Sequence, residues 1–429
     1  MIVLLMFIAM LILVFVGIPI AVSLIFTSFI GLWVLLGFSQ ASEMFVTGPY
    51  NILANYTYAV APLFMLMGNF ASASGIVSDA FVSARNWLGN LRGGLLMATI
   101  VAGALFGACT GSSIASAALF GRIAYPETQK EGYDSAVSSG AIAVTGTLAM
   151  LIPPSIMMVF YGIFTQLSIG SLLIAGVVPG IIVTVFLMVS ISIVGAIYPR
   201  RMPKPTKMAV SWRERFRSLV AIGPIGIIFI ALIGGLYIGF FTPTQAGAIG
   251  ATITLLTLLI RKRRQLQMRD IWSSLVDASA LTAQVYFLIL GGFLFSRFVA
   301  FSGVLRTMVE WVGNLPIPPV GIMAILVVLY LILGAILDPV SMLVITIPFV
   351  YPIVTALGWD GIAFGVIMII LVEMAVITPP IGFNVYAVAS AAGIPAGVVF
   401  LGVIPFYSVV LVVLWLIILF PEIATFLIR

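Results

Sequence analysis

The sequence predicts an all-α polytopic membrane protein, built from an inverted structural repeat with two re-entrant helical hairpins and two Pro-Pro-broken helices. Hydrophobic residues make up 62% of the 429 residues and charged residues only 7%, too few for a water-facing surface. The chain also carries part of its sequence twice. When it is shifted by 226 positions, Pro153-Pro154 falls on Pro379-Pro380, and Gly176 falls on Gly402. Matched breaks inside apolar stretches are typical of membrane proteins with two repeats.

Ten apolar stretches have the length that a membrane crossing requires, about 20 residues. The expected spans are 2–17, 19–36, 52–75, 135–165, 169–198, 219–240, 243–260, 277–299, 361–390 and 396–420. Residues 1–36 contain no charged residue, so we interpret them as retained helices and not as a signal peptide. We therefore expect almost no extramembrane domain.

Two further apolar stretches, 95–121 and 320–357, are predicted to be re-entrant hairpins. Basic residues flank the first stretch on both sides, which places both flanks in the cytoplasm under the positive-inside bias. Its small and polar centre, 107–113, is the expected tip, and 333–339 occupies the corresponding place in the second stretch. Non-helical backbone at membrane depth is tolerated only where it is buried in protein or lines a cavity. The tips are therefore candidate ligand sites.

The topology follows from counting, because each half contains five crossings and one hairpin. Five is an odd number, so the second repeat, 219–429, is inverted relative to the first repeat, 1–199. A cytoplasmic basic amphipathic linker, 200–218, is expected to join them on the membrane surface. The segments 77–92 and 304–315 precede the two hairpins, and both carry Trp-x-Gly-Asn-Leu at a shift of 224. They are ordinary interfacial loops or arms that brace the hairpins, and the repetition favours arms.

Each Pro-Pro pair removes backbone donors from a span and disturbs the preceding turn. Carbonyls 146–152 and 374–378 are therefore expected to lack partners, and such oxygens suit a desolvated sodium ion. The first expected sodium site contains Ser112, Ser113, Thr145, Gly146, Thr147 and Ile152, and the second contains Gly334, Asp338, Met374 and Thr378. A proline kink healed by Ser and Thr back-bonding is the alternative for either break.

Two acidic residues lie deep in the predicted membrane segments, Asp338 at the second tip and Glu373 before the second Pro-Pro pair. A charge at mid-bilayer costs about 2.5–3.5 kcal/mol on insertion scales and points to function. Asp338 is the stronger ligand candidate, whereas Glu373 is a ligand, protonated, or paired within the fold. Their repeat partners, Gly111 and Thr147, are uncharged, so the two ion sites are not expected to be chemically identical.

The expected substrate contacts are polar side chains near the tips and breaks. Arg297 either holds a carboxylate through its two-pronged guanidinium or snorkels to the interface. The full set is Ser113, Ser155, Arg297, Asp338 and Asn384. A single candidate arginine suits one carboxylate.

Missing residue types argue against an enzyme. The chain has no histidine, which excludes a Ser-His dyad and a His-ligated metal. Its four lysines lie in loops, and its one cysteine, Cys109, excludes an internal disulfide. We expect no cofactor, no metal other than Na+, and no nucleic-acid partner.

The sequence resembles the large membrane subunit of TRAP (tripartite ATP-independent periplasmic) transporters, in the ion-transporter superfamily. The resemblance rests on Gly17-Ile18-Pro19, Phe241–Ala246, Thr110–Ser113 and the two Pro-Pro pairs. It implies a bacterial inner-membrane, elevator-type carrier that imports an organic acid with sodium, either sialic acid or a C4-dicarboxylate. The single candidate arginine favours sialic acid, because it suits one carboxylate. The resemblance also implies a small four-helix membrane subunit and a periplasmic substrate-binding protein as partners. The usual Thr-Glu of one motif is Thr244-Gln245 here, which puts a role for that acid in doubt.

Three rival functions fit the same fold expectation. A proton-coupled carrier would depend on Asp338 and Glu373. An anion channel would also use paired hairpins, although the polar residues concentrate at tips and breaks instead of along a pore. A non-transporting membrane scaffold would tolerate replacement of the tips.

Overall fold

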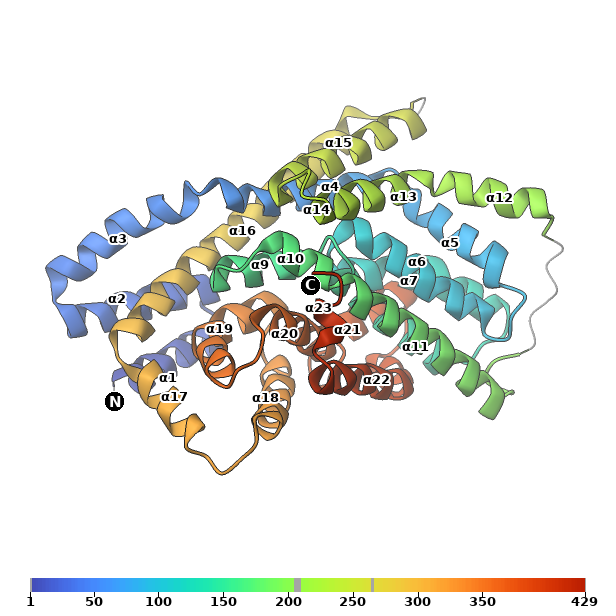
Figure 1. Cartoon of the computed structure of the whole chain (residues 1–429). Coiled ribbons are helices and arrows are strands. Elements are labelled where there is room, and N and C mark those ends of the chain that lie inside the picture. The colour runs from blue at the N-terminus through green and yellow to red at the C-terminus, as the bar shows by residue number, and fades with distance from the viewer. Residues whose placement is uncertain (1, 204–209, 264–265, 429) are drawn as a thin grey trace.

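The computed structural model describes residues 2–203, 210–263 and 266–428, and every regular element within these ranges is a helix (Figure 1). The first half contains α1 (Ile2–Phe15), α2 (Ile20–Leu36), α3 (Phe38–Leu53), η1 (Tyr56–Ala59), α4 (Val60–Ala73), α5 (Ile76–Leu88), α6 (Gly94–Thr110), α7 (Ser113–Lys130), α8 (Ser135–Leu151), α9 (Ile156–Thr165), α10 (Ile169–Ala175) and α11 (Val177–Ile197). The predicted all-α class is confirmed.

The second half follows a linker that the structure describes only in part. It contains α12 (Trp212–Ala221), α13 (Gly223–Phe229), the π-helical η2 (Ile230–Gly234), α14 (Gly235–Tyr237), α15 (Pro243–Arg261), α16 (Met268–Phe301), α17 (Val304–Gly313), α18 (Pro319–Gly334), α19 (Pro339–Ala356), α20 (Gly361–Ala375), α21 (Phe383–Ala392), α22 (Ala396–Leu419) and α23 (Glu422–Thr425). Lys204 and Lys207 of the expected linker lie outside the described residues. The division into 1–199, 200–218 and 219–429 stays a prediction.

Five helices in the described part are long and apolar enough to cross a membrane, or up to eight if each of three bent pairs counts as one span. Four of the five match expected spans, and the fifth, α19, belongs to the expected second hairpin. The expected spans 2–17 and 19–36 correspond to the shorter apolar helices α1 and α2. No helix was predicted between the expected spans 19–36 and 52–75, where the structure has α3.

Both expected hairpins are present. The first turns between α6 and α7 at Gly111, whose φ of 59° lies in the left-handed region that favours glycine. The Ser112 hydroxyl accepts the Ala115 N–H at 3.4 Å and caps α7. The second hairpin turns between α18 and α19, where Asp338 caps α19. Each tip therefore ends with a polar cap at the start of its returning helix.

Both expected helix breaks are also present. α8 ends at Leu151 and α9 begins at Ile156, with a bend of 44° between them. α20 ends at Ala375 and α21 begins at Phe383. The Pro153-Pro154 and Pro379-Pro380 bonds are both cis. The prolines thus separate two half-helices in each repeat, as expected from their missing N–H groups.

The helices form an inner group around the hairpins and breaks and an outer group beside it. In the inner group, α8 packs on α6, α7 and α22, and α7 packs on α21. In the outer group, α4 packs on α15 and α16, and α16 packs on α2. The groups meet where α4 contacts α6 and α9, and where α16 contacts α19. This boundary places the first hairpin tip beside α4.

The expected amphipathic segments form helices α5, α12 and α17. In Figure 1, α5 and α17 lie on opposite sides of the molecule. α12 packs across α5 through Trp87 and Trp212, whose ring centroids are 6.3 Å apart. Ser211 and Glu214 form a capping box at the start of α12. Hydrogen bonds from the Ser211 N–H and hydroxyl hold the pKa of the Glu214 carboxyl below its usual value.

Candidate functional site

The first hairpin tip touches the first break. A Cβ on Gly111 would lie 3.2 Å from the Pro154 carbonyl oxygen and 3.3 Å from the Ile156 nitrogen. One turn earlier, a Cβ on Gly107 would lie 2.6 Å from the Ala149 Cα. Glycine is required at both places, because a side chain would push the tip away from the break. The expected pairing of this tip and break is therefore present.

Gly146 lies where three segments meet near this tip. A Cβ at this position would lie 2.8 Å from the Ser113 carbonyl oxygen and 2.8 Å from the Asn384 amide nitrogen. Ser113 begins α7, Gly146 lies in α8, and Asn384 lies in α21 after the second break. The tertiary fold thus brings together the expected first ion site and an expected substrate contact from the other half.

The second hairpin tip contacts the helix before the second break. Gly334, at the end of α18, lies so close to Ala375 that a Cβ on Gly334 would overlap the Ala375 side chain. The Asp338 carboxylate accepts the Val340 N–H at 3.1 Å and the Ser341 N–H at 3.2 Å, as well as the Ser341 hydroxyl. Asp338 therefore serves as a helix cap whether or not it also binds an ion.

The threonines of both expected ion sites bond to their own helices. Thr145 and Thr147 donate to the Ala141 and Val144 carbonyls at 2.8 and 2.7 Å. Thr378 donates to the Met374 carbonyl at 2.6 Å. The threonine hydroxyls thus donate to backbone carbonyls three or four residues earlier, as expected for a proline kink healed by Ser and Thr. Such a bond uses only the hydrogen of each hydroxyl. The lone pairs of each hydroxyl remain available to a cation.

The expectation that the carbonyls before each break lack partners was wrong for several of them. Leu148 O accepts the Ile152 N–H at 2.9 Å, and Ala375 O accepts the Thr378 N–H at 3.1 Å. Val376 O accepts the Asn384 N–H at 2.9 Å. The backbone around each break forms local hydrogen bonds, which were not expected from the missing N–H groups of the prolines. A carbonyl oxygen has two lone pairs, so these atoms retain one for a ligand.

A buried polar cluster joins the two halves at the first tip. The Ser113 hydroxyl donates to Glu373 Oε2 at 2.8 Å and accepts the Asn384 amide at 2.7 Å. The same amide donates to the Ala143 carbonyl at 3.2 Å. Ser113 and Asn384 are fully buried, and Glu373 is 2% exposed. Both amide hydrogens of Asn384 are used, so its oxygen is the atom that remains free to contact a ligand.

A cavity of about 460 Å³ lies at the boundary between the inner and outer groups, beside the first tip; we call it the tip cavity. Ser112 at the tip and Arg122 of α7 line it together with Asn69 and Ser72 of α4, and α9, α16 and α19 supply apolar residues. Arg122 makes no ion pair within the described ranges. The cavity therefore offers an uncompensated guanidinium and several hydroxyl and amide groups to an anion.

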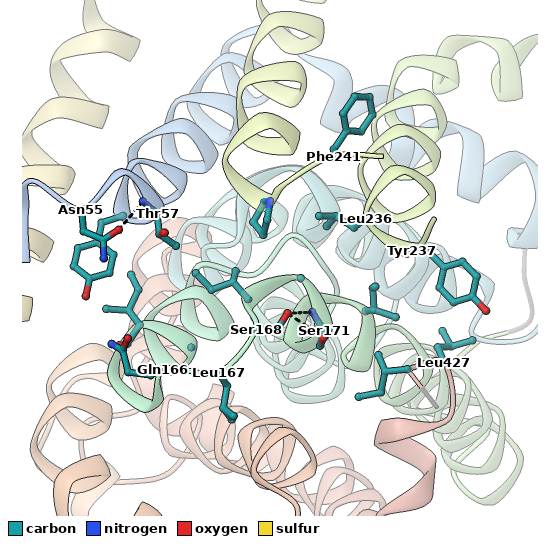
Figure 2. Close-up of a pocket in the computed structure, with 18 residues that line it drawn as sticks. Asn55, Thr57, Gln166, Leu167, Ser168, Ser171, Leu236, Tyr237, Phe241 and Leu427 are labelled. Carbon is teal, nitrogen blue, oxygen red and sulfur yellow. Dashed lines mark hydrogen bonds between the residues drawn. The ribbon is translucent and has the colours of Figure 1, made fainter. Parts of the chain in front are cut away.

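A larger cavity of about 800 Å³ lies at the other end of α9; we call it the outer cavity (Figure 2). In Figure 2, Asn55, Thr57, Gln166, Ser168 and Ser171 border it, with Ser171 donating to Ser168 at 3.0 Å. Pro243, the first residue of α15, also lines it. α15 ends at Arg261 in the basic cluster, so the positive-inside bias places this cavity on the side opposite the cytoplasm.

The two cavities flank α9 along its length. Ile156, Met157 and Phe160, in its first turns, line the tip cavity, whereas Gly162 and Ile163 line the outer cavity. The break at Pro153-Pro154 lies directly before this helix. α9 therefore stands between the two cavities, and the first tip lines the tip cavity.

None of the five expected substrate contacts, Ser113, Ser155, Arg297, Asp338 and Asn384, is among the residues that line these cavities. Ser155 is fully buried and caps α9 by accepting the Met158 N–H at 3.3 Å. Arg297 lies in α16, with a guanidinium nitrogen 3.6 Å from where a Cβ on Gly48 of α3 would stand.

The polar lining of the tip cavity was not predicted from the sequence. Arg122 was interpreted only as a basic flank, and Asn69 and Ser72 were not singled out at all. A signal was present, because Ser72 lies three residues after Asn69 in an otherwise apolar span and residues at this spacing share a helix face. Nothing in the spacing alone indicated that this face meets α7.

Comparison with known families identifies one match. A family model described as "Tripartite ATP-independent periplasmic transporter, DctM component" matches residues 7–423. The chain is 32% identical to the C4-dicarboxylate TRAP transporter large permease protein DctM of Pseudomonas aeruginosa, over 90% of this chain and 88% of that protein.

Other relatives carry different substrates in their names. The chain is 29% identical to the ectoine/5-hydroxyectoine large permease UehC of Ruegeria pomeroyi, over 98% of this chain and 97% of that protein. It is 28% identical to the sialic acid large permease SiaM of Vibrio cholerae, over 96% and 94%. Its fold is similar to that of the Alcanivorax borkumensis YdaH transporter, with a TM-score of 0.59 at 14% identity over 89% of this chain and 88% of that one.

Proposed function

The chain belongs to the DctM family of tripartite ATP-independent periplasmic transporters, and from this premise we propose that it is the large permease subunit of a sodium-coupled importer of an organic acid. The pairing of the first tip with the first break carries the proposal. Two half-helix ends and a hairpin tip meet there, and such unwound segments are where carriers bind ions and substrate.

Sodium is the proposed coupling ion, with one ion held at each break. The first site uses Thr145, Thr147 and the carbonyls beside Gly146, and the second uses Asp338 of the second tip with Met374 and Thr378. Hydroxyl and carbonyl oxygens suit a hard cation. Each tenfold sodium gradient supplies about 1.4 kcal/mol. Each net charge that enters adds about 2.3 kcal/mol per 100 mV, so two sodium ions with one monoanion supply roughly 5 kcal/mol at 100 mV.

The proposed cycle moves the inner group against the outer group, as an elevator. Two cavities motivate this proposal. Residues of both the inner and the outer group line the tip cavity, and the outer cavity lies at the other end of α9. Sliding along this boundary would close one cavity and open the other. The bacterial inner membrane is the proposed location, because a periplasmic binding protein and a separate small membrane subunit are the proposed partners.

The proposed substrate is an organic acid whose carboxylate binds Arg122. The relatives' substrates, a C4-dicarboxylate, sialic acid and ectoine, share a carboxylate. The guanidinium of Arg122 lines the tip cavity with Ser112, whereas Arg297 does not.

We expect Arg122→Gln to raise the KM for the imported acid by about tenfold to a hundredfold, because a charge-assisted hydrogen bond contributes about 1.5–3 kcal/mol. Arg297→Gln should leave KM within about twofold. Arg122→Lys should recover only part of the loss, because lysine keeps the charge without the paired donors. Uptake kinetics of the three variants measure this, and a larger effect at Arg297 would move the carboxylate site there.

We expect Asp338→Ala to weaken sodium activation of uptake, and Asp338→Ser separates the two roles of this residue. Serine restores the helix cap, which is worth about 0.5–2 kcal/mol, but supplies no charge. If Asp338 binds sodium, the serine variant regains thermal stability but still requires several times more sodium for half-maximal uptake. Unchanged sodium dependence in both variants would argue strongly against Asp338 as a ligand.

The function is tested by uptake into proteoliposomes that hold this chain, its small partner and a loaded binding protein. Labelled succinate, sialic acid and ectoine are offered with and without an inward sodium gradient. Uptake that needs both sodium and the binding protein supports the proposal and identifies the substrate. Uptake driven only by a pH gradient would replace sodium with protons. Rapid flux without either gradient would favour an anion channel, and no flux would favour a scaffold.

A further inference from the structure

The Ser113 cluster, formed by Ser113, Glu373 and Asn384, contains two buried oxygen atoms without a partner. Glu373 Oε1 and Asn384 Oδ1 are both inaccessible to solvent and accept no hydrogen bond from any described residue. Buried polar atoms are nearly always paired, and leaving one unpaired costs about 1–3 kcal/mol. Two such atoms on side chains that share one serine therefore call for an explanation.

Both unpaired atoms are acceptors. Asn384 directs its nitrogen at the Ala143 carbonyl, and the flipped amide would set two carbonyl oxygens against each other, so Oδ1 is the free atom. The single hydrogen of the Ser113 hydroxyl goes to Glu373 Oε2, and the hydroxyl accepts from Asn384. Ser113 thus has no hydrogen left for either atom, and each unpaired oxygen is free to accept a donor or to bind a cation.

The helices that pack on α20 supply Glu373 with no positive charge, and in α7, whose Ser113 bonds to Glu373, the first basic residue is Arg122, in the third turn of the helix. The helices that pack on α20 contain neither lysine nor arginine; they are α8, α9, α10, α18, α19, α22 and α23. α21, which holds Asn384, contains none either. A buried carboxylate without a counter-charge is strongly disfavoured. A bound cation would both compensate this charge and satisfy the two acceptors.

We propose that Glu373 Oε1 and Asn384 Oδ1 bind one further sodium ion, in addition to the two ions at the breaks. A carboxylate and an amide carbonyl are oxygen ligands that hard cations prefer. This inference rests on the proposed sodium-coupled transport, and it changes the stoichiometry, because the third ion travels with the substrate. Its ligands come from both sides of the second break, so it also holds α20 and α21 against the first hairpin.

The test uses Glu373→Gln, which keeps the shape of the side chain and an acceptor for Ser113 but removes the charge. Steady-state accumulation of the imported acid is measured at zero membrane potential with a tenfold sodium gradient. Loss of one coupled sodium ion lowers the accumulation ratio tenfold, whereas a purely structural defect slows uptake without changing that ratio. Glu373→Asp keeps the charge and should keep the ratio, and Glu310→Gln on exposed α17 is the matched control.

The outcomes separate this inference from the proposed function. If the wild-type chain shows no sodium-driven accumulation, the proposed function fails. If wild type accumulates substrate but Glu373→Gln reaches the same ratio, the third site is wrong. If Glu373→Gln instead removes a dependence on a pH gradient, the cation is a proton and the sodium site is overturned. Should the variant not fold, tracer sodium bound to wild type decides, with three ions per chain expected and two contradicting the site.

Discussion

Replacing Gly402 with alanine is expected to prevent α22 from packing on α8 and to remove transport. A Cβ at Gly402 would overlap the Ala136 carbonyl of α8 and would lie 3.1 Å from the Gly140 nitrogen. These are backbone atoms, which cannot rotate away as a side chain could. Overpacking of this kind costs about 1–3 kcal/mol and occasionally more, a large share of the stability of a folded chain. Thermal unfolding of the purified protein in detergent measures the loss.

Gly397→Ala in the same helix is the matched control, because a Cβ at Gly397 would meet no atom within 4 Å. It should leave the unfolding temperature and uptake close to those of the wild type. Gly140→Ala should reproduce the Gly402 defect from the other side of the contact, since its Cβ would overlap the Gly402 backbone. Normal stability of Gly402→Ala would contradict the close approach of these helices.

Gly146→Ala is expected to weaken sodium activation by about tenfold to a hundredfold while the protein still folds. The added methyl would lie 2.8 Å from both the Ser113 carbonyl oxygen and the Asn384 amide nitrogen, so one of them must move. A strain of about 1.4–2.8 kcal/mol in the ion-bound state corresponds to this range. The measurement is the sodium concentration that gives half-maximal uptake, together with the amount of folded protein in the membrane.

Gly226→Ala in α13 serves as its control, because a Cβ there meets no neighbour within 4 Å. A variant at Gly146 that loses uptake at every sodium concentration and also fails to fold would not support an ion-site role. A selective shift in sodium dependence, with normal protein levels, separates strain at the first site from general damage.

Local features of the sequence were sufficient for the membrane class, the hairpins and the breaks. The high apolar content and the low charge predict a membrane protein, because few charged residues can face lipid. Gly111 and the Pro-Pro pairs fix tips and breaks through their own backbone chemistry, which needs no distant partner. The repeat even paired Gly176 with Gly402, and both lie against a neighbouring backbone carbonyl, that of Leu151 or Ala136. α3 was missed because Ser, Gln, Gly and Pro interrupt its pattern.

The contents of the site depend on contacts that sequence spacing does not encode. Ser113 and Glu373 are 260 positions apart, yet their side chains share a hydrogen bond. Arg122 and Ser112 line one cavity only because α4 and α16 close it over α7. Hydrophobicity and proline chemistry act within a segment, and so the sequence alone determined where helices lie, turn and break. Which polar groups meet at those breaks was decided by tertiary packing, since side-chain partners are selected by the helices that the fold brings together.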